Sequence, residues 1–143
     1  MTQQDKDLLY KDMCARLPYG VKVRVTPVPE LKHLTYDAKL FNINTNNIFG
    51  VITDDNVKYI PHNVEDVKPY LFPLSNMTEE QFNELKKLGY IENCAHCREI
   101  PFKLKWIKTF SLPLLHWLLE NHFDINDLIP MGLAIDATGL NIY

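Results

Sequence analysis

Residues 36–60, YDAKLFNINTNNIFGVITDDNVKYI, decide the fold of this chain. Three apolar runs, at residues 36–43, 48–52 and 57–60, are separated by two clusters of Asn, Asp and Thr. Asn and Asp favour tight turns because their short polar side chains bond to nearby backbone and tolerate positive φ. Short strands joined by such turns pair with their neighbours, so the stretch predicts an antiparallel three-stranded meander.

A fourth strand is predicted at residues 21–25, VKVRV, where valine alternates with Lys22 and Arg24. Successive side chains of a strand point to opposite faces, so the valines face a core and the two cations face the other way. Added to the meander, this strand predicts a small curled antiparallel sheet, one form of which is an SH3-like partial barrel.

About three helices are expected to pack with this sheet. Residues 5–17 carry apolar side chains at four-residue steps, which is the period of a helix with one buried face. Residues 78–88 begin with Thr78 and have a glutamine three positions later, which is the spacing of a capping box. Ser111 is expected to cap a third helix at residues 112–120, whose mostly apolar positions predict a place in the core.

The remaining segments are predicted from shorter signals. Residues 67–74 contain two prolines, which lack a backbone donor, so we expect an extended segment and not a central strand. Alternating residues at 100–108 predict a strand, and residues 133–135 predict a short final one. Asp124 is expected to cap a short turn between them. The whole of residues 1–143 is therefore expected to be one α+β domain.

The overall composition is that of an ordinary folded domain. Of the 143 residues, 46% are hydrophobic and 23% charged, which excludes a disordered chain. The formal net charge of −3 disfavours nucleic-acid binding but leaves room for a local basic patch. The sequence lacks a secretory signal and a run of about 18 apolar residues, and its odd cysteine count is unlike a disulfide framework. We therefore expect a cytoplasmic protein with no membrane partner.

Cys94 and Cys97 form the sharpest local motif, since two cysteines separated by two residues can bind one zinc ion. A closed zinc site needs two further ligands, and His116 and His122 are the histidines downstream. A redox dithiol is a second interpretation, but Pro101 opens a strand-like run where an activating helix would be needed. Two ordinary thiols are the third interpretation. We expect no metal and no cofactor.

The alternating run of Phe102, Leu104 and Trp106 with Lys103 and Lys105 is the sequence feature closest to a nucleic-acid motif. Single-strand binding needs aromatic and cationic side chains on the same exposed face. In a strand, these aromatics and lysines lie on opposite faces. The run therefore predicts core residues backed by a solvated lysine face.

No catalytic motif stands out in the sequence. Asp54 and Asp55 belong to a predicted turn, and Glu79 and Glu80 suit the positive end of a helix dipole. No motif links a nucleophile to any of the five histidines, His33, His62, His96, His116 and His122.

Three blocks of the chain resemble one family. They are residues 11–21 (KDMCARLPYGV), 67–78 (VKPYLFPLSNMT) and 122–135 (HFDINDLIPMGLAI). Together they resemble a family of small uncharacterised proteins from phages and prophages of gut bacteria. The resemblance implies a phage-associated setting, and it implies no activity.

The functional prediction from the sequence is a non-enzymatic, phage-associated accessory module that binds a protein partner, either a phage or a host component. Two alternatives stay open at this point. One is a nucleic-acid-binding small barrel domain, and the other is an enzyme with a dispersed active site. No catalytic, cofactor-binding or metal-binding residue is assigned.

Overall fold

The computed structural model describes residues 1–27, 34–44, 46, 48–53, 56–88 and 111–143. Several sequence predictions therefore lie outside the described residues. These are the turn aspartates Asp54 and Asp55, the Cys94 and Cys97 pair, and the strand at 100–108 with its aromatic residues and lysines.

Six strands form one mostly antiparallel, open sheet in the order β4-β3-β2-β1-β5-β6. The strands are β1 (Lys22–Val25), β2 (Tyr36–Ile43), β3 (Ile48–Thr53), β4 (Asn56–Asn63), β5 (Val67–Leu71) and β6 (Ile135–Asp136). Strands β2, β3 and β4 pair antiparallel in sequence order, which confirms the predicted meander. Strand β6 pairs with β5 in parallel. The α+β fold class is confirmed.

In the described part of the chain, three α-helices accompany the sheet, namely α1 (Gln3–Arg16), α2 (Glu79–Lys87) and α3 (Leu112–Glu120). The predicted capping box of α2 is present. The Thr78 hydroxyl accepts from the Gln81 N–H at 3.2 Å, and the Gln81 side chain accepts from the Thr78 N–H at 2.9 Å. Ser111 occupies the N-cap position of α3, but its side chain makes no capping hydrogen bond. A short 3-10 turn, η1 (Leu17–Tyr19), follows α1.

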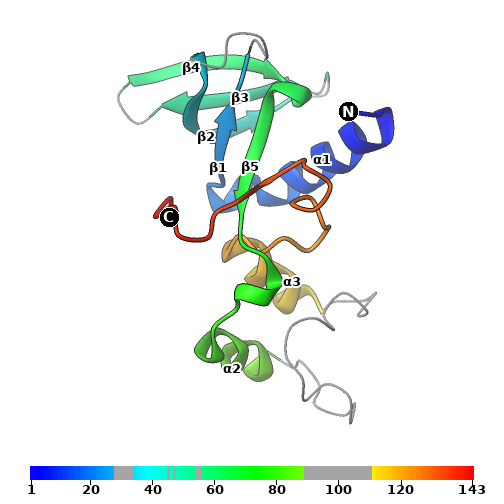
Figure 1. The fold of residues 1–143 in the computed structure, drawn as a ribbon, viewed down its shortest axis with the longest axis vertical. Coiled ribbons are helices and arrows are strands. Elements are labelled where there is room, and N and C mark those ends of the chain that lie inside the picture. The colour runs from blue at the N-terminus through cyan, green and yellow to red at the C-terminus, as the bar shows by residue number, and fades with distance from the viewer. Residues whose placement is uncertain (28–33, 45, 47, 54–55, 89–110) are drawn as a thin grey trace.

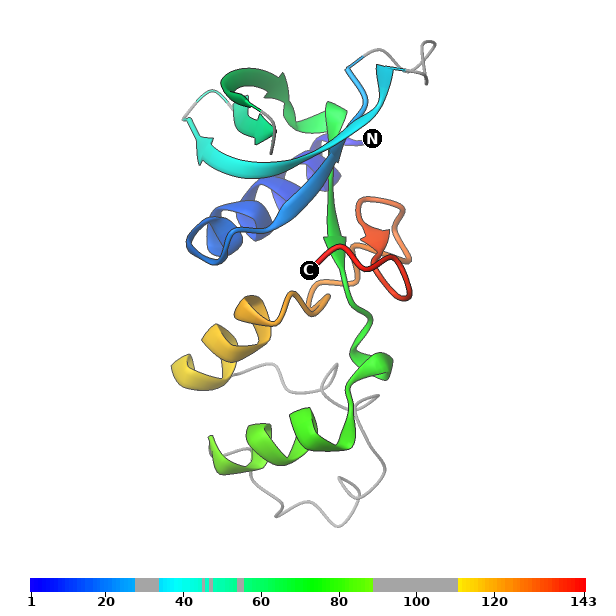
Figure 2. The ribbon, with the colours of Figure 1, turned by 90° about the vertical axis from the view of Figure 1, so that its left-hand side faces the viewer.

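Helix α1 covers one face of the sheet, as Figure 1 and Figure 2 show from two directions. Leu9 and Met13 of α1 are fully buried against side chains that alternate along the strands. The sheet side of this core is formed by Val21, which directly precedes β1, and by the strand residues Val23, Val25, Ala38, Leu40, Phe49, Val51, Val67 and Leu71. The valines of residues 21–25 therefore face the core, as their alternation predicts.

Helices α2 and α3 lie beyond the end of β5, away from the sheet, in both views (Figures 1 and 2). They share a second apolar cluster, in which Leu85 of α2 and Leu118 of α3 are fully buried. The apolar composition of residues 112–120 predicted a place in the core. Helix α3 does bury part of its surface, but in the cluster that it shares with α2 and Phe123 and not in the cluster that α1 forms with the sheet.

The prediction that residues 67–74 would not supply a central strand is wrong for β5. Strand β5 lies between β1 and β6. The physical reason is the position of Pro69 in the ladder. Pro69 lies opposite Val23 of β1, while the pairing with β6 begins one residue later, at Tyr70. Within the described residues, β5 therefore pairs at Pro69 with β1 alone. A residue that lacks a backbone N–H is tolerated where the strand has an unpaired side.

Tyr143 lies between β1 and β5 where their ladder stops. Continuing the register past Val23 and Pro69 would bring Lys22 opposite Tyr70. Instead, the Tyr143 hydroxyl accepts from the Lys22 N–H at 3.1 Å and donates to the Tyr70 carbonyl at 2.8 Å. One phenol group therefore satisfies a donor of β1 and an acceptor of β5.

Replacing Tyr143 with phenylalanine is expected to lower the free energy of unfolding by about 1–2 kcal/mol, because both backbone groups lose their partner. Urea denaturation followed by circular dichroism measures the change. Tyr10→Phe is the control, since the Tyr10 hydroxyl donates a long bond of 3.3 Å to an exposed carbonyl, that of Asn44. An unchanged unfolding free energy for Tyr143→Phe would show that the strands close on each other without the hydroxyl.

Candidate functional site

A buried polar cluster joins α1 to the segment that follows α3. Asp12 and Arg16, one helical turn apart, form an ion pair whose side chains have no exposed surface. Arg16 Nε donates to Asp12 Oδ2 at 2.6 Å, and Arg16 Nη2 donates to the Phe123 carbonyl at 2.8 Å. Asn126 Nδ2 donates to Asp12 Oδ1 at 2.8 Å. The pair therefore acts as a polar anchor between segments that are distant in sequence.

Asp124 shapes the segment that the anchor holds. Its carboxylate accepts from the backbone N–H groups of Leu128 at 2.9 Å and Ile129 at 2.8 Å, with a longer contact of 3.4 Å to that of Asn126. The predicted turn cap is thus confirmed. Burial raises the pKa of Asp124, and the three backbone N–H groups oppose that rise.

His122 has a φ of 58°, and its ring stacks on that of Tyr143 at a centroid distance of 3.8 Å. Burial, reinforced by the Arg16 cation, lowers the pKa of His122 to about 4. His122 Nδ1 and Arg16 Nη1 are buried and have no hydrogen-bond partner among the described residues. The imidazole is therefore held neutral near pH 7 by its surroundings.

The buried cluster is organised as a structural element. The ion pair and the Asp124 carboxylate form their hydrogen bonds with other groups of the protein, and Asp12, Arg16, His122 and Asp124 are almost fully buried. Of the two histidines considered as zinc ligands, His122 belongs to this cluster and His116 is exposed on α3, 6.3 Å from the Tyr19 ring. Within the described ranges, no group of three or more His, Cys, Asp or Glu side chains is placed to hold a metal ion.

The sheet face opposite α1, called the outer face from here on, gathers cations. The register places Lys22 opposite Lys39, and it places Arg24 opposite both Asp37 and Lys68. These side chains alternate with the buried core residues of β1, β2 and β5 and therefore point away from α1. The outer face comprises Lys22, Arg24, Asp37, Lys39, Phe41, Ile52 and Lys68, with the fully buried Tyr70 beneath Arg24.

A bonded network fixes one part of the outer face. Asp37 Oδ1 accepts from Arg24 Nε at 3.0 Å and from the Tyr70 hydroxyl at 2.6 Å. The Arg24 guanidinium also lies over the Tyr70 ring, 5.3 Å from its centroid. Burial acts to raise the pKa of Asp37, but the bonds from Arg24 and Tyr70 outweigh it and lower that pKa. Asp37 therefore stays charged and neutralises Arg24.

The lysines give the outer face its charge. Four cations, Lys22, Arg24, Lys39 and Lys68, face one carboxylate, Asp37, among its members. Lys39 and Lys68 are exposed, and neither forms an ion pair within the described part of the chain. The outer face is thus locally basic on a chain whose formal net charge is −3.

Phe41 is an exposed aromatic side chain beside these cations. The β2–β3 register shifts by one residue between Leu40 and Asn42, so Phe41 is the extra residue of a β-bulge. Bulges redirect side chains, and Phe41 is 57% exposed. It lines a hollow of about 580 Å³ at the edge of the outer face. The hollow is lined by Leu17, Pro18, Tyr19, Gly20, Lys39, Leu40, Phe41, Ile52 and Glu120.

Gly20 shapes the wall of this hollow. Its φ is 67°, in the left-handed region, and it caps the 3-10 turn η1 by donating its N–H to the Leu17 carbonyl. A Cβ atom at this position would stand 2.7 Å from Cε of Lys39. The absence of a side chain at Gly20 therefore lets the Lys39 stem lie along the wall.

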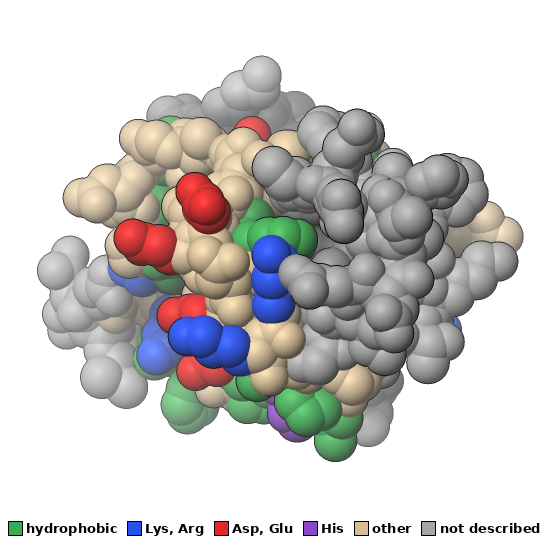
Figure 3. All heavy atoms as spheres, turned by 90° about the horizontal axis from the view of Figure 1, so that it is seen from below, with side chains coloured by type: hydrophobic (Ala, Val, Ile, Leu, Met, Phe, Trp, Pro, Cys, Tyr) green, Lys and Arg blue, Asp and Glu red, His purple; other side chains and the backbone are tan. Residues whose placement is uncertain are grey.

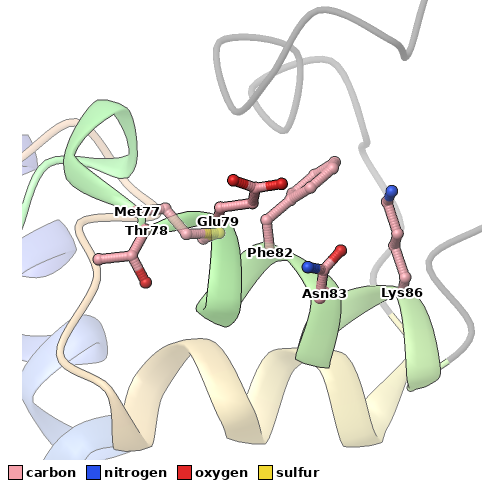
Figure 4. A pocket seen from close by; sticks show the side chains of 6 residues that line it. All are labelled: Met77, Thr78, Glu79, Phe82, Asn83 and Lys86. Carbon is pink, nitrogen blue, oxygen red and sulfur yellow. The ribbon is translucent and has the colours of Figure 1, made fainter.

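A second hollow, of about 360 Å³, lies along α2. Figure 4 shows the side chains of Phe82 and Lys86 on the side of α2 that faces away from α3. Lys86 Nζ lies 4.9 Å from the Phe82 ring centroid. Seen from this end of the molecule, acidic and basic side chains lie next to one another in Figure 3. The described residues at this end therefore do not form a surface of one charge sign. The outer face is the stronger candidate for a functional site.

The sequence analysis predicted part of the outer face. It placed Lys22 and Arg24 on the face opposite the valines, and the structure confirms this. It did not single out Lys39 or Phe41. A signal was available, because Lys39 alternates with two core residues of β2 in the same way. The bulge that exposes Phe41 depends on pairing with β3, which a single strand does not reveal.

Comparison with known proteins finds no matching family model, no matching curated protein and no matching solved structure. None of the described helices is long and apolar enough to cross a membrane. The phage-associated setting, the accessory role and the dispersed active site all stay predictions.

Proposed function

We propose that this protein is a nucleic-acid-binding module that uses the outer face of its sheet. The observation that carries the proposal is the exposed Phe41 beside a row of cations on one sheet face. A sheet face that combines aromatic and basic side chains binds nucleic acid through base stacking and phosphate contacts. The sequence analysis considered such a surface at residues 102–106 and decided against it, and the present proposal rests instead on β1, β2 and β5.

The local distribution of charge supports nucleic-acid binding, although the formal net charge of −3 disfavours it. Long-range attraction to a polyanion depends on the local field of a surface as well as on the total charge. Lys39 and Lys22 form one row across β2 and β1, and Arg24 and Lys68 continue it on β1 and β5. Adjacent strands lie about 4.8 Å apart, so these cations follow a short continuous path.

A protein partner is the second candidate function, and the hollow supports it. Leu17, Tyr19 and Ile52 give the hollow an apolar lining, while Lys39 and Glu120 supply one charge of each sign. A peptide with an apolar anchor and charged neighbours would fit such a lining. This candidate explains the hollow but gives no role to Lys68 on β5.

Fluorescence anisotropy with labelled oligonucleotides tests the proposal. We expect binding at about 50 mM salt that weakens steeply as salt rises, because released counterions drive association. The double variant Lys39→Gln/Lys68→Gln is expected to reduce the salt slope for a single strand by about 1.4, corresponding to two lost phosphate contacts. The matched control, Lys11→Gln/Lys87→Gln, removes two exposed cations, one from α1 and one from α2, that lie outside the outer face.

Two results would count against nucleic-acid binding. One is the absence of binding to any oligonucleotide at low salt. The other is an equal loss in the Lys11→Gln/Lys87→Gln control, which would indicate attraction to total charge and not to the outer face. Binding to an acidic peptide but to no oligonucleotide would support the second candidate instead.

A further inference from the structure

We propose that the outer face selects single strands and seats one unstacked base in the hollow against Phe41, with Glu120 favouring bases that carry an exocyclic amino group. This inference rests on the proposed nucleic-acid function and names its ligand. It is carried by the positions of three side chains around one hollow, Phe41, Lys39 and Glu120.

Phe41 supplies the argument for a single strand. Its ring is 57% exposed and belongs to the lining of the hollow, with Tyr19 and Ile52 as neighbours in that lining. A base inside a duplex is stacked on both sides, so its flat surface is closed to a protein ring. A base in a single strand can leave its neighbours and stack on an aromatic side chain.

Lys39 links the hollow to the cation path. It lines the hollow and also lies opposite Lys22 in the β1–β2 register. A nucleotide seated at Phe41 would therefore carry its phosphate toward Lys39. The strand on that side would continue across the sheet toward Arg24 and Lys68, which are paired in the β1–β5 register.

Glu120 supplies the argument for base preference. It ends α3 and lines the hollow, although it comes from a different element than the strands. A carboxylate accepts hydrogen bonds but donates none, so it suits the amino group of cytosine or adenine. Thymine places a carbonyl oxygen on each side of its single ring N–H, and those oxygens are repelled by a carboxylate.

The first experiment compares single-stranded and duplex oligonucleotides of about twelve nucleotides by anisotropy. We expect the single strands to bind about tenfold more tightly than a duplex of the same length, and Phe41→Leu to remove most of that difference. The control is Leu112→Ala, which alters an apolar side chain that is 64% exposed at the start of α3. Equal binding of duplex and single strands by the wild type would overturn the inference.

The second experiment compares oligo-dC with oligo-dT. We expect oligo-dC to bind more tightly by about fivefold to tenfold. Glu120→Gln is expected to reduce this ratio by tightening the binding of oligo-dT, because an amide can donate to the thymine carbonyls. If the variant strengthens binding of both oligonucleotides by the same factor, Glu120 acts through charge repulsion alone and the base preference is refuted.

The outcomes separate this inference from the proposed function. One outcome is salt-dependent binding that is equal for single strands and duplex, equal for oligo-dC and oligo-dT, and unchanged in Phe41→Leu. It would support a nucleic-acid-binding face but refute a base-binding hollow. Binding to none of these probes would remove the proposed function, and this inference with it. Heparin serves as a polyanion without bases, and wild-type affinity for heparin equal to that for oligo-dC would also refute base seating.

Discussion

Replacing Asp12 with alanine is expected to lower the free energy of unfolding by about 3–5 kcal/mol, the largest effect of any single substitution proposed for this chain. The substitution leaves the Arg16 cation fully buried without its carboxylate. Arginine does not lose its proton in proteins, so the charge cannot be removed by a pKa shift. Asn126 also loses its acceptor. Chemical denaturation followed by circular dichroism measures the loss.

Two further variants test the cause of this effect. Glu65→Ala removes the carboxylate of the surface pair with Lys6 and is expected to cost no more than about 1 kcal/mol. The double variant Asp12→Leu/Arg16→Met removes both buried charges and is expected to recover much of the lost stability, because apolar pairs of similar volume often replace buried ion pairs. An Asp12→Ala variant as stable as Glu65→Ala would contradict the anchor described here.

Acidification from pH 7 to pH 5 is expected to destabilise the protein through His122 by about 2 kcal/mol. The pKa of His122 in the folded protein is lowered from 6.5 to about 4. Between these two values the unfolded chain binds a proton at His122 and the folded chain does not. Proton binding to the unfolded chain favours unfolding, so stability is complete above pH 6.5 and falls as the pH approaches 4.

The variant His122→Asn isolates this contribution. Asparagine tolerates the φ of 58° at this position and does not titrate in this range. Tyr143, which stacks on His122, stays neutral between pH 5 and pH 7, because burial raises its pKa to about 12. Asp124 acts in the opposite direction, because its raised pKa makes the folded protein hold a proton more strongly as pH falls.

The measurement is the unfolding free energy of both proteins at pH 7 and pH 5. The Asp124 contribution is present in both proteins, so the difference between their pH dependences reports His122. Wild type is expected to lose about 2 kcal/mol more than His122→Asn over this interval. Parallel losses in the two proteins would show that His122 does not carry the pH dependence.

Local features of the fold followed from the sequence because each depended on neighbouring residues. Thr78 and Gln81 bond to each other's backbone across one helical turn. The valines of β1 are buried because strand side chains alternate. The turn capped by Asp124 needs only backbone donors within five residues. These interactions leave a pattern in the order of the residues.

Interactions between distant residues were not predictable in this way. Arg16 bonds to the carbonyl of Phe123, and Tyr143 bonds to both Lys22 and Tyr70. The central position of β5 required knowing that β6 pairs from Tyr70 onward, beyond Pro69. No periodicity along the chain encodes which distant segment supplies a partner.

The candidate site also has one part that the sequence predicted and one part that it did not. Sequence by itself determined the alternation that puts Lys22 and Arg24 on the face away from the core, since the pleat of a strand requires it. Tertiary structure decided that Lys39 and Lys68 join them, that a bulge against β3 exposes Phe41, and that Glu120 of α3 reaches the same hollow. The physical reason is that register and packing depend on contacts between elements, which local chain geometry does not specify.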